Sequence, residues 1–151
     1  MGFYKTLYGA ALVAAFAAPA LAQDMNAIEA RQGQFKLYGH NIAVLGGMAQ
    51  GRMDYDAEMA QTAADNLFHL TRHDQSRLWP EGTDSSMVME TRAKAEIWEN
   101  LDDFTAKFVA LQEASAALQG VAGDGLDALR PAVGAVGASC GACHEDYREE
   151  S

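Results

Sequence analysis

The sequence predicts an all-α protein, an antiparallel up-down bundle of four helices. Three observations favour this fold. Apolar residues recur at intervals of three and four positions in four segments, and no segment shows the alternation of a β-strand. Stretches rich in Gly, Pro or Asp separate these segments. The length of 151 residues and the apolar content of 49% suit one domain with an ordinary core.

The first two helices are expected over residues 27–51 and 57–72. The inward positions of the first helix are Ile28, Phe35, Tyr38, Ile42, Leu45 and Ala49. Arg31 and Gln32 interrupt this apolar stripe with polar side chains. The acidic break at residues 54–56 supplies an N-cap for the second helix. Its inward positions are Ala60, Ala63, Ala64, Leu67 and Leu70.

The third and fourth helices follow a long connection rich in turn-forming residues at 79–86. The third helix is expected to run without a break through Ile97, Leu101, Phe104, Phe108, Leu111, Ser115 and Leu118. Glycines within 120–125 end it, and Asp124 is expected to cap the fourth helix. The inward positions of the fourth helix are Leu126, Leu129, Val133, Val136, Cys140, Cys143 and Tyr147. Both cysteines therefore belong to the side of this helix that faces the core.

Residues 1–22 have the pattern of a secretory signal peptide. Lys5 precedes an uncharged, mostly apolar run at 7–18, and Ala20 and Ala22 are the small residues of a cleavage site. The apolar run is shorter than the roughly 20 residues that span a bilayer. We therefore expect an exported protein whose folded domain covers residues 23–151, with no membrane attachment after the leader is removed.

The charge of the chain excludes one class of partner. Twenty-one acidic residues against eleven basic ones give a formal net charge of −10. Such a chain repels the phosphate backbone of nucleic acids, and no cluster of basic residues offsets this repulsion. Nucleic-acid binding is therefore excluded.

The residues Cys140-Gly141-Ala142-Cys143-His144 have the CxxCH spacing of a c-type haem attachment site. Two thiols three residues apart lie on one face of a helical turn, where they can add to the two vinyl groups of one porphyrin. The adjacent imidazole then reaches the iron as its proximal ligand. The fold class therefore becomes a four-helix bundle with one covalently attached haem c per chain.

Two other interpretations of these cysteines remain open. A thioredoxin-like redox CxxC begins a helix after a strand, whereas this motif lies at the end of an all-helical chain. A local disulfide would leave His144 without a role. Haem attachment explains all three residues and is favoured.

A sixth iron ligand has to come from upstream, because only the seven residues 145–151 follow His144. The histidines lie outside the apolar stripes of their helices and are expected to face solvent: His40, His69 and His73. A weak surface metal site is the alternative for His69 and His73. The methionines near the far end of the first helix, Met48 and Met53, are expected to fill the core or an interface, and Met25 precedes that helix. None of these side chains is placed over an iron by the sequence pattern.

The chain resembles the cytochromes c′, the class II haem proteins of bacterial periplasms, over essentially all of the mature sequence. The segments that carry the resemblance are EARQGQFK at 29–36, WPEGT at 79–83, AEIW at 95–98 and GASCGACHEDYR at 137–148. The CxxCH motif alone occurs in many families. Its position near the C-terminus, together with the CHxxYR pattern and the N-terminal Arg-Gln pair, is much more specific.

The resemblance implies a set of haem contacts. Arg31 and Gln32 would bind the haem propionates, since a buried propionate needs a cation and hydrogen-bond donors. Phe35 would block the distal face of the iron, Arg148 would lie near the proximal imidazole, and Met87 would touch the haem edge. These residues add to Cys140, Cys143 and His144, of which His144 would be the metal ligand.

The resemblance also implies the function. Phe35 at the distal position implies a five-coordinate, high-spin iron that is redox active and binds the diatomic gases nitric oxide and carbon monoxide. It further implies a homodimer packed through the first two helices. The alternative is a six-coordinate, low-spin class II electron-transfer cytochrome with a redox partner that the sequence does not identify. No acid–base residue is placed on the distal side, so an enzymatic activity is not expected.

Removing both thiols tests the attachment. We expect the double variant Cys140→Ala, Cys143→Ala to lose covalent haem and to fold poorly, because the cofactor fills the interior of the bundle. The measurement is acid extraction of the denatured protein followed by detection of haem on the chain. Complete release of haem from the wild-type protein would show that the attachment is not covalent.

Overall fold

The computed structural model describes residues 17–150, which form five helices. Their bounds are α1 Ala17–Ala49, α2 Ala57–Leu70, α3 Glu96–Glu99, α4 Leu101–Gln119 and α5 Leu126–Tyr147. Residues 1–16, most of the expected leader, lie outside the described part of the chain.

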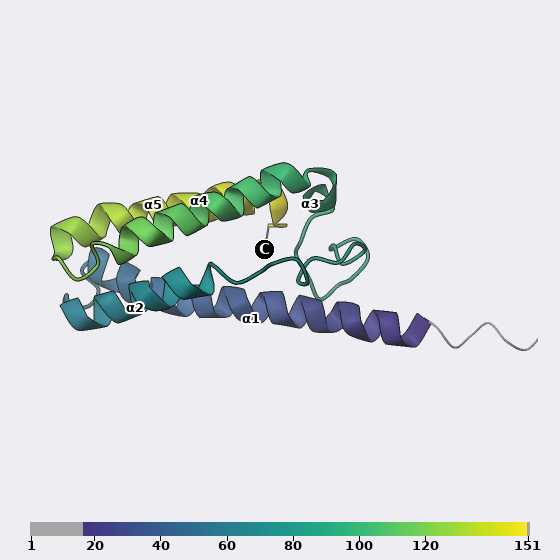
Figure 1. Ribbon diagram of the computed structural model, residues 1–151, viewed down its shortest axis with the longest axis horizontal. Helices are drawn as coiled ribbons and strands as arrows, with labels where there is room; N and C mark the ends of the chain where they lie inside the picture. The colour runs from purple at the N-terminus through teal and green to yellow at the C-terminus, as the bar shows by residue number, and fades with distance from the viewer. Residues whose placement is uncertain (1–16, 151) are drawn as a thin grey trace, which may run out of the picture.

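The four long helices form an antiparallel up-down bundle, which confirms the predicted fold class (Figure 1). The helices α1 and α2 make one layer, and α4 and α5 make the other. Helix α1 packs against α2 and α5, and α4 packs against the same two helices. Within residues 17–150, no helix is long and apolar enough to cross a membrane.

A glycine and an aspartate form the turn between α1 and α2: Gly51 ends the first helix and Asp56 caps the second. Gly51 adopts φ 70°, and its N–H donates to the carbonyl of Met48 while the N–H of Arg52 donates to that of Gly47. This pattern closes the end of a helix with a glycine in the left-handed region. Asp56 then caps α2 by accepting a hydrogen bond from the Met59 N–H at 2.8 Å.

Three expected boundaries were wrong. Helix α1 begins at Ala17, inside the expected leader, because the alanine-rich stretch before residue 23 has high helix propensity. The expected third helix is divided at Asn100, whose side chain donates to the Glu96 carbonyl and whose backbone leaves the helical region. Gly125, at φ 117°, takes the capping position of α5 that was expected for Asp124.

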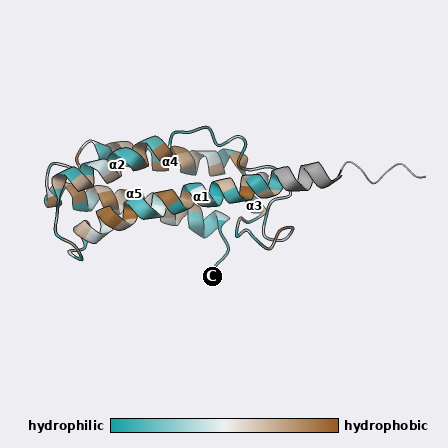
Figure 2. Cartoon of the chain, turned by 90° about the horizontal axis from the view of Figure 1, so that it is seen from below, coloured by the Kyte–Doolittle hydropathy of each residue, from teal (hydrophilic) through white to brown (hydrophobic). Residues whose placement is uncertain are grey.

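The hydrophobic core consists of two clusters along the bundle. Hydrophobic and hydrophilic residues alternate along the helices in Figure 2, as amphipathic packing requires. The larger cluster includes Leu45, Met48, Leu67, Leu118, Leu129 and Val136. The smaller cluster contains Ala93, Ile97, Phe104, Phe108 and Tyr147. Phe35 packs against both clusters, so it marks the place where they meet.

Candidate functional site

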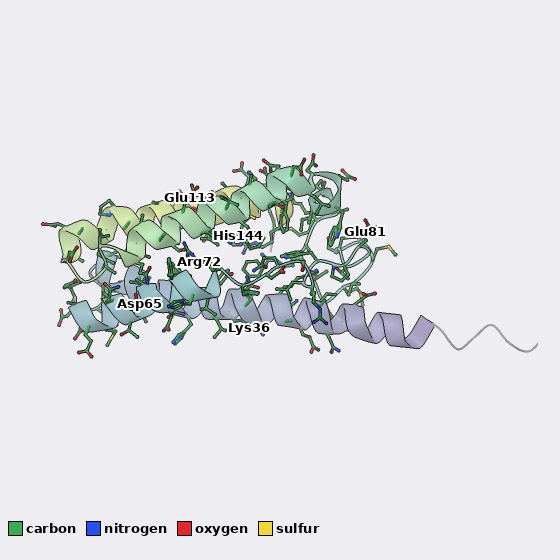
Figure 3. All side chains as sticks on the ribbon, viewed as in Figure 1. Lys36, Asp65, Arg72, Glu81, Glu113 and His144 are labelled. Atoms are coloured by element: carbon green, nitrogen blue, oxygen red, sulfur yellow. The ribbon has the colours of Figure 1, made fainter. Side chains whose placement is uncertain are left out.

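The CxxCH residues lie where the two core clusters meet. Cys140 packs against the larger cluster and Cys143 against the smaller one, and both side chains are partly buried. His144 is also partly buried and lies between the α1–α2 layer and the α4–α5 layer (Figure 3). Helix α5 continues through all three residues to Tyr147. The two sulfurs and the imidazole therefore face the interior from adjacent positions on one rigid element.

The electrostatics of the two thiols do not suit a redox pair. Burial raises the pKa of Cys140, and it raises the pKa of Cys143 to about 11. A reactive CxxC thiol has a lowered pKa, usually because a helix N-terminus or a cation stabilises its thiolate. Both cysteines are free, and the motif lies in the last turns of a helix. These properties disfavour the redox interpretation and leave the thiols available for thioether bonds.

His144 is kept in the form that binds a metal. Burial lowers its pKa, and the positive charges of Arg148 and Arg92 lower it further. Since only a neutral imidazole has a free lone pair, this environment favours iron ligation. Arg148 was expected near this imidazole, and its charge acts on it in the structure. Arg92 was not anticipated from the sequence.

Phe35 is the aromatic residue of α1 that faces His144. Their ring centroids are 6.4 Å apart. The Phe35 side chain has no atom that donates or accepts an ordinary hydrogen bond. Other rings enclose Phe35: Tyr38 at 5.6 Å, Trp79 at 6.3 Å and Phe108 at 6.5 Å. The site is therefore walled by aromatic rings from α1, α4 and the connection between α2 and α3.

Arg31 is buried and ties α1 to the connection between α2 and α3. Only 2% of its surface is exposed. One terminal nitrogen donates to the Leu78 carbonyl and the Thr83 hydroxyl, and the other donates to the Thr83 carbonyl and the Thr91 hydroxyl. Burial lowers the pKa of Arg31 to about 10, so the side chain stays charged at neutral pH. Within residues 17–150, no carboxylate forms an ion pair with it.

Gln32 and Met87 are two further expected haem contacts, and only Gln32 lies with Arg31 against the connection between α2 and α3. The Gln32 side chain donates to the Glu90 carbonyl at 2.6 Å, so it holds the far end of the same connection. Met87 lies on that connection with 71% of its surface exposed, and the structure does not bring it together with the other expected haem contacts.

The end of α5 is anchored to its neighbours by contacts that follow His144. The Tyr147 hydroxyl donates to Asp103 of α4 at 2.6 Å, and Lys107 pairs with Asp146 at 2.7 Å. The Lys94 N–H donates to the Tyr147 carbonyl at 3.1 Å. These contacts fix the turn of α5 that carries the imidazole.

Sequence reasoning missed several residues that shape the site. Trp79 was given only as part of the connection and of the WPEGT segment, with no role in the site, yet its ring centroid lies 4.8 Å from that of Phe104 and 4.7 Å from the Arg31 guanidinium carbon. Thr83 and Thr91 were not singled out, although they hold Arg31. One feature of the sequence could have drawn attention to Trp79: it is one of only two tryptophans in the chain, and it directly precedes Pro80.

The residues present fit a haem c group. A flat apolar ring attached through Cys140 and Cys143 would lie where the two core clusters meet. The buried Arg31 charge and the buried Trp79 indole nitrogen, which has no hydrogen-bond partner in the described part of the chain, both suit the haem carboxylates.

Comparison with known proteins agrees with this geometry. Residues 26–148 match the protein family described as "Cytochrome C'". The cytochrome c′ of Cereibacter sphaeroides is 45% identical over 140 residues, which cover 92% of this chain and 94% of the relative.

Solved structures of the family have the same fold. A structure described as cytochrome c′ from "Rhodobacter Spheriodes" superimposes with a TM-score of 0.83 at 43% identity, over 85% of this chain and 98% of that one. A cytochrome c′ described as having an unusual ligand-controlled dimer dissociation has a TM-score of 0.76 at 28% identity, over 84% and 97% of the two chains. The chain therefore belongs to the cytochrome c′ family, and its cofactor is haem c.

Proposed function

We propose that this protein is a periplasmic, redox-active haem protein whose five-coordinate, high-spin iron binds nitric oxide and carbon monoxide. The observation that carries the proposal is the position of Phe35, which faces His144 across the interior. An apolar ring has no lone pair to give to a metal. The Phe35 ring therefore closes the side of the site opposite His144 to bulky ligands, and it does not itself coordinate the iron.

Each residue of the site has a definite task in this proposal. When bound, haem c supplies an iron that changes oxidation state and has one coordination position left for a diatomic gas. Cys140 and Cys143 hold the cofactor on α5, and His144 presents its neutral imidazole. Arg31 and Gln32 provide the polar end of the site. Phe35 excludes water and anions, because any incoming group has to displace its ring.

The described candidates for a sixth ligand do not support the low-spin alternative. Met48 is 1% exposed and packs within the larger core cluster, whereas Met53 is 40% exposed at the end of α1. The histidines at 40, 69 and 73 line a groove between α1 and α2 on the surface. Among residues 17–150, no acid or base is placed on the side opposite His144, so we do not propose an enzymatic activity.

Shrinking Phe35 tests the gating role. We expect Phe35→Ala to speed carbon monoxide association tenfold or more, because the ring no longer has to move; a tenfold change corresponds to about 1.4 kcal/mol of barrier. Stopped-flow mixing of the reduced protein with carbon monoxide measures the rate. Phe68→Ala is the matched control, since the Phe68 ring contacts His69 and Arg72 instead of the site. Equal rates in Phe35→Ala and the wild type would contradict the gate.

The periplasmic location rests on the leader at residues 1–22. We propose that cleavage after Ala22 leaves Gln23 as the mature N-terminus, since Ala20 and Ala22 have the small side chains that such a site needs. Intact-mass analysis of the protein purified from its periplasmic fraction should give residues 23–151 plus one haem. A purified protein that retains residues 1–22 would contradict export by this leader.

We also propose a homodimer formed through the outer face of α1 and α2. Leu37 on α1 and Met59 on α2 are 50% and 47% exposed, and the grooves lined by His40, Asn41 and Asn66 lie between these helices. Exposed apolar side chains beside a groove are typical of an association surface. The relative with a ligand-controlled dimer shows that a protein of this fold can associate.

A charge placed on this face should separate the dimer. We expect Leu37→Glu to elute as a monomer in size-exclusion chromatography with light scattering, because a twofold interface brings the new carboxylates of both copies into it. Val109→Glu is the matched control, since Val109 on α4 is 45% exposed on another face. A wild-type monomer, or dissociation of both variants alike, would contradict an α1–α2 interface.

A further inference from the structure

The two tryptophans of the chain differ in how their indole N–H groups are satisfied. The Trp98 Nε1–H donates to the Trp79 carbonyl at 3.1 Å. The Nε1 atom of Trp79 is buried and has no partner among residues 17–150. Of the three buried side-chain atoms without a partner in this part of the chain, it is the only donor, since the other two are amide oxygens of Gln34 and Gln75. A buried donor without an acceptor is costly, so this N–H requires an explanation.

Trp79 lies in the enclosure that surrounds the haem site. Its ring centroid is 4.8 Å from that of Phe104, 6.2 Å from Phe108 and 6.3 Å from Phe35. Phe35 in turn faces His144 at 6.4 Å. Trp79 also packs in the same core cluster as Cys143. These rings supply no hydrogen-bond acceptor of ordinary strength, so the acceptor has to come from a group that is bound in the enclosure.

The neighbouring charge indicates the nature of that group. The Arg31 guanidinium carbon lies 4.7 Å from the Trp79 ring centroid. Its two terminal nitrogens bond neutral oxygens, and no carboxylate of the described chain neutralises it. Burying a positive charge costs free energy, and a nearby anion reduces that cost. A carboxylate can accept from the indole and offset the guanidinium charge, whereas a water molecule can do only the first.

We propose that the Trp79 indole N–H donates a hydrogen bond to a carboxylate of the haem and, with Arg31, forms its anion-binding site. The backbone limits the position of Trp79, because Pro80 restricts the conformation of the residue that precedes it. Trp79 is thus a cofactor-binding residue contributed by the connection between α2 and α3. The inference requires haem c but no particular coordination state of the iron. A result that contradicts the Trp79 contact therefore leaves gas binding unaffected, and a result that contradicts gas binding leaves the Trp79 contact unaffected.

The test compares two variants that make the same chemical change. Trp79→Phe keeps an aromatic ring in the enclosure but removes the N–H together with the five-membered part of the indole. Trp98→Phe makes the same loss at an indole whose N–H already has a backbone partner. Resonance Raman spectroscopy of the holoprotein detects the bending band of the haem propionates, which responds to hydrogen bonds at the carboxylate. We expect this band to shift in Trp79→Phe and to stay at the wild-type position in Trp98→Phe. An unshifted band in Trp79→Phe, or equal shifts in both variants, would overturn the inference.

A second measurement does not depend on Trp79→Phe folding or acquiring haem. In the Trp98→Phe holoprotein, Trp79 is the one remaining tryptophan. Ultraviolet resonance Raman spectroscopy of this variant reports whether the indole N–H is hydrogen-bonded, and we expect a strong hydrogen bond. A crystal structure of the wild-type holoprotein should then place Nε1 about 2.7–3.2 Å from a carboxylate oxygen of the haem. A free N–H, or an N–H bonded to water, would overturn the inference.

Discussion

In the proposed function, one constraint governs this fold: three neighbouring residues of α5 have to reach a single rigid, flat cofactor from inside the bundle. Cys140, Cys143 and His144 face the interior because they continue the apolar stripe of that helix. The core is correspondingly made of two clusters that meet at Phe35. The Tyr147–Asp103 hydrogen bond and the Lys107–Asp146 pair then hold the end of α5 in place against α4.

The polar end of the site depends on a second buried group. Arg31 stands in the apolar stripe of α1, where a charge is unfavourable unless several acceptors surround it. Oxygens of Leu78, Thr83 and Thr91 surround the guanidinium, so the connection between α2 and α3 is shaped around this side chain. The same residue thereby positions Trp79 and leaves a positive charge for the cofactor's carboxylates. In the proposed function, one side chain would serve both the fold and the binding of haem.

The sequence predicted the features that have strong local signals. Apolar spacing gave the four helices, the acidic break gave the Asp56 cap, and CxxCH gave the attachment residues. The break at Asn100 was missed because the apolar pattern continues across it. The contacts of Arg31 could not be predicted, since Thr83 and Thr91 lie more than 50 residues away in a connection without periodicity. The orphaned Trp79 nitrogen is likewise visible only in three dimensions.

The most direct test of the central claim is the absorption spectrum of the reduced wild-type protein. Phe35 has no atom that can coordinate iron, and its ring faces the imidazole that can. The iron should therefore show the broad Soret and visible bands of a five-coordinate, high-spin haem, and carbon monoxide should convert them to the sharp bands of a low-spin complex. Sharp low-spin bands before any gas is added would show that a side chain occupies the sixth position, which would contradict the account.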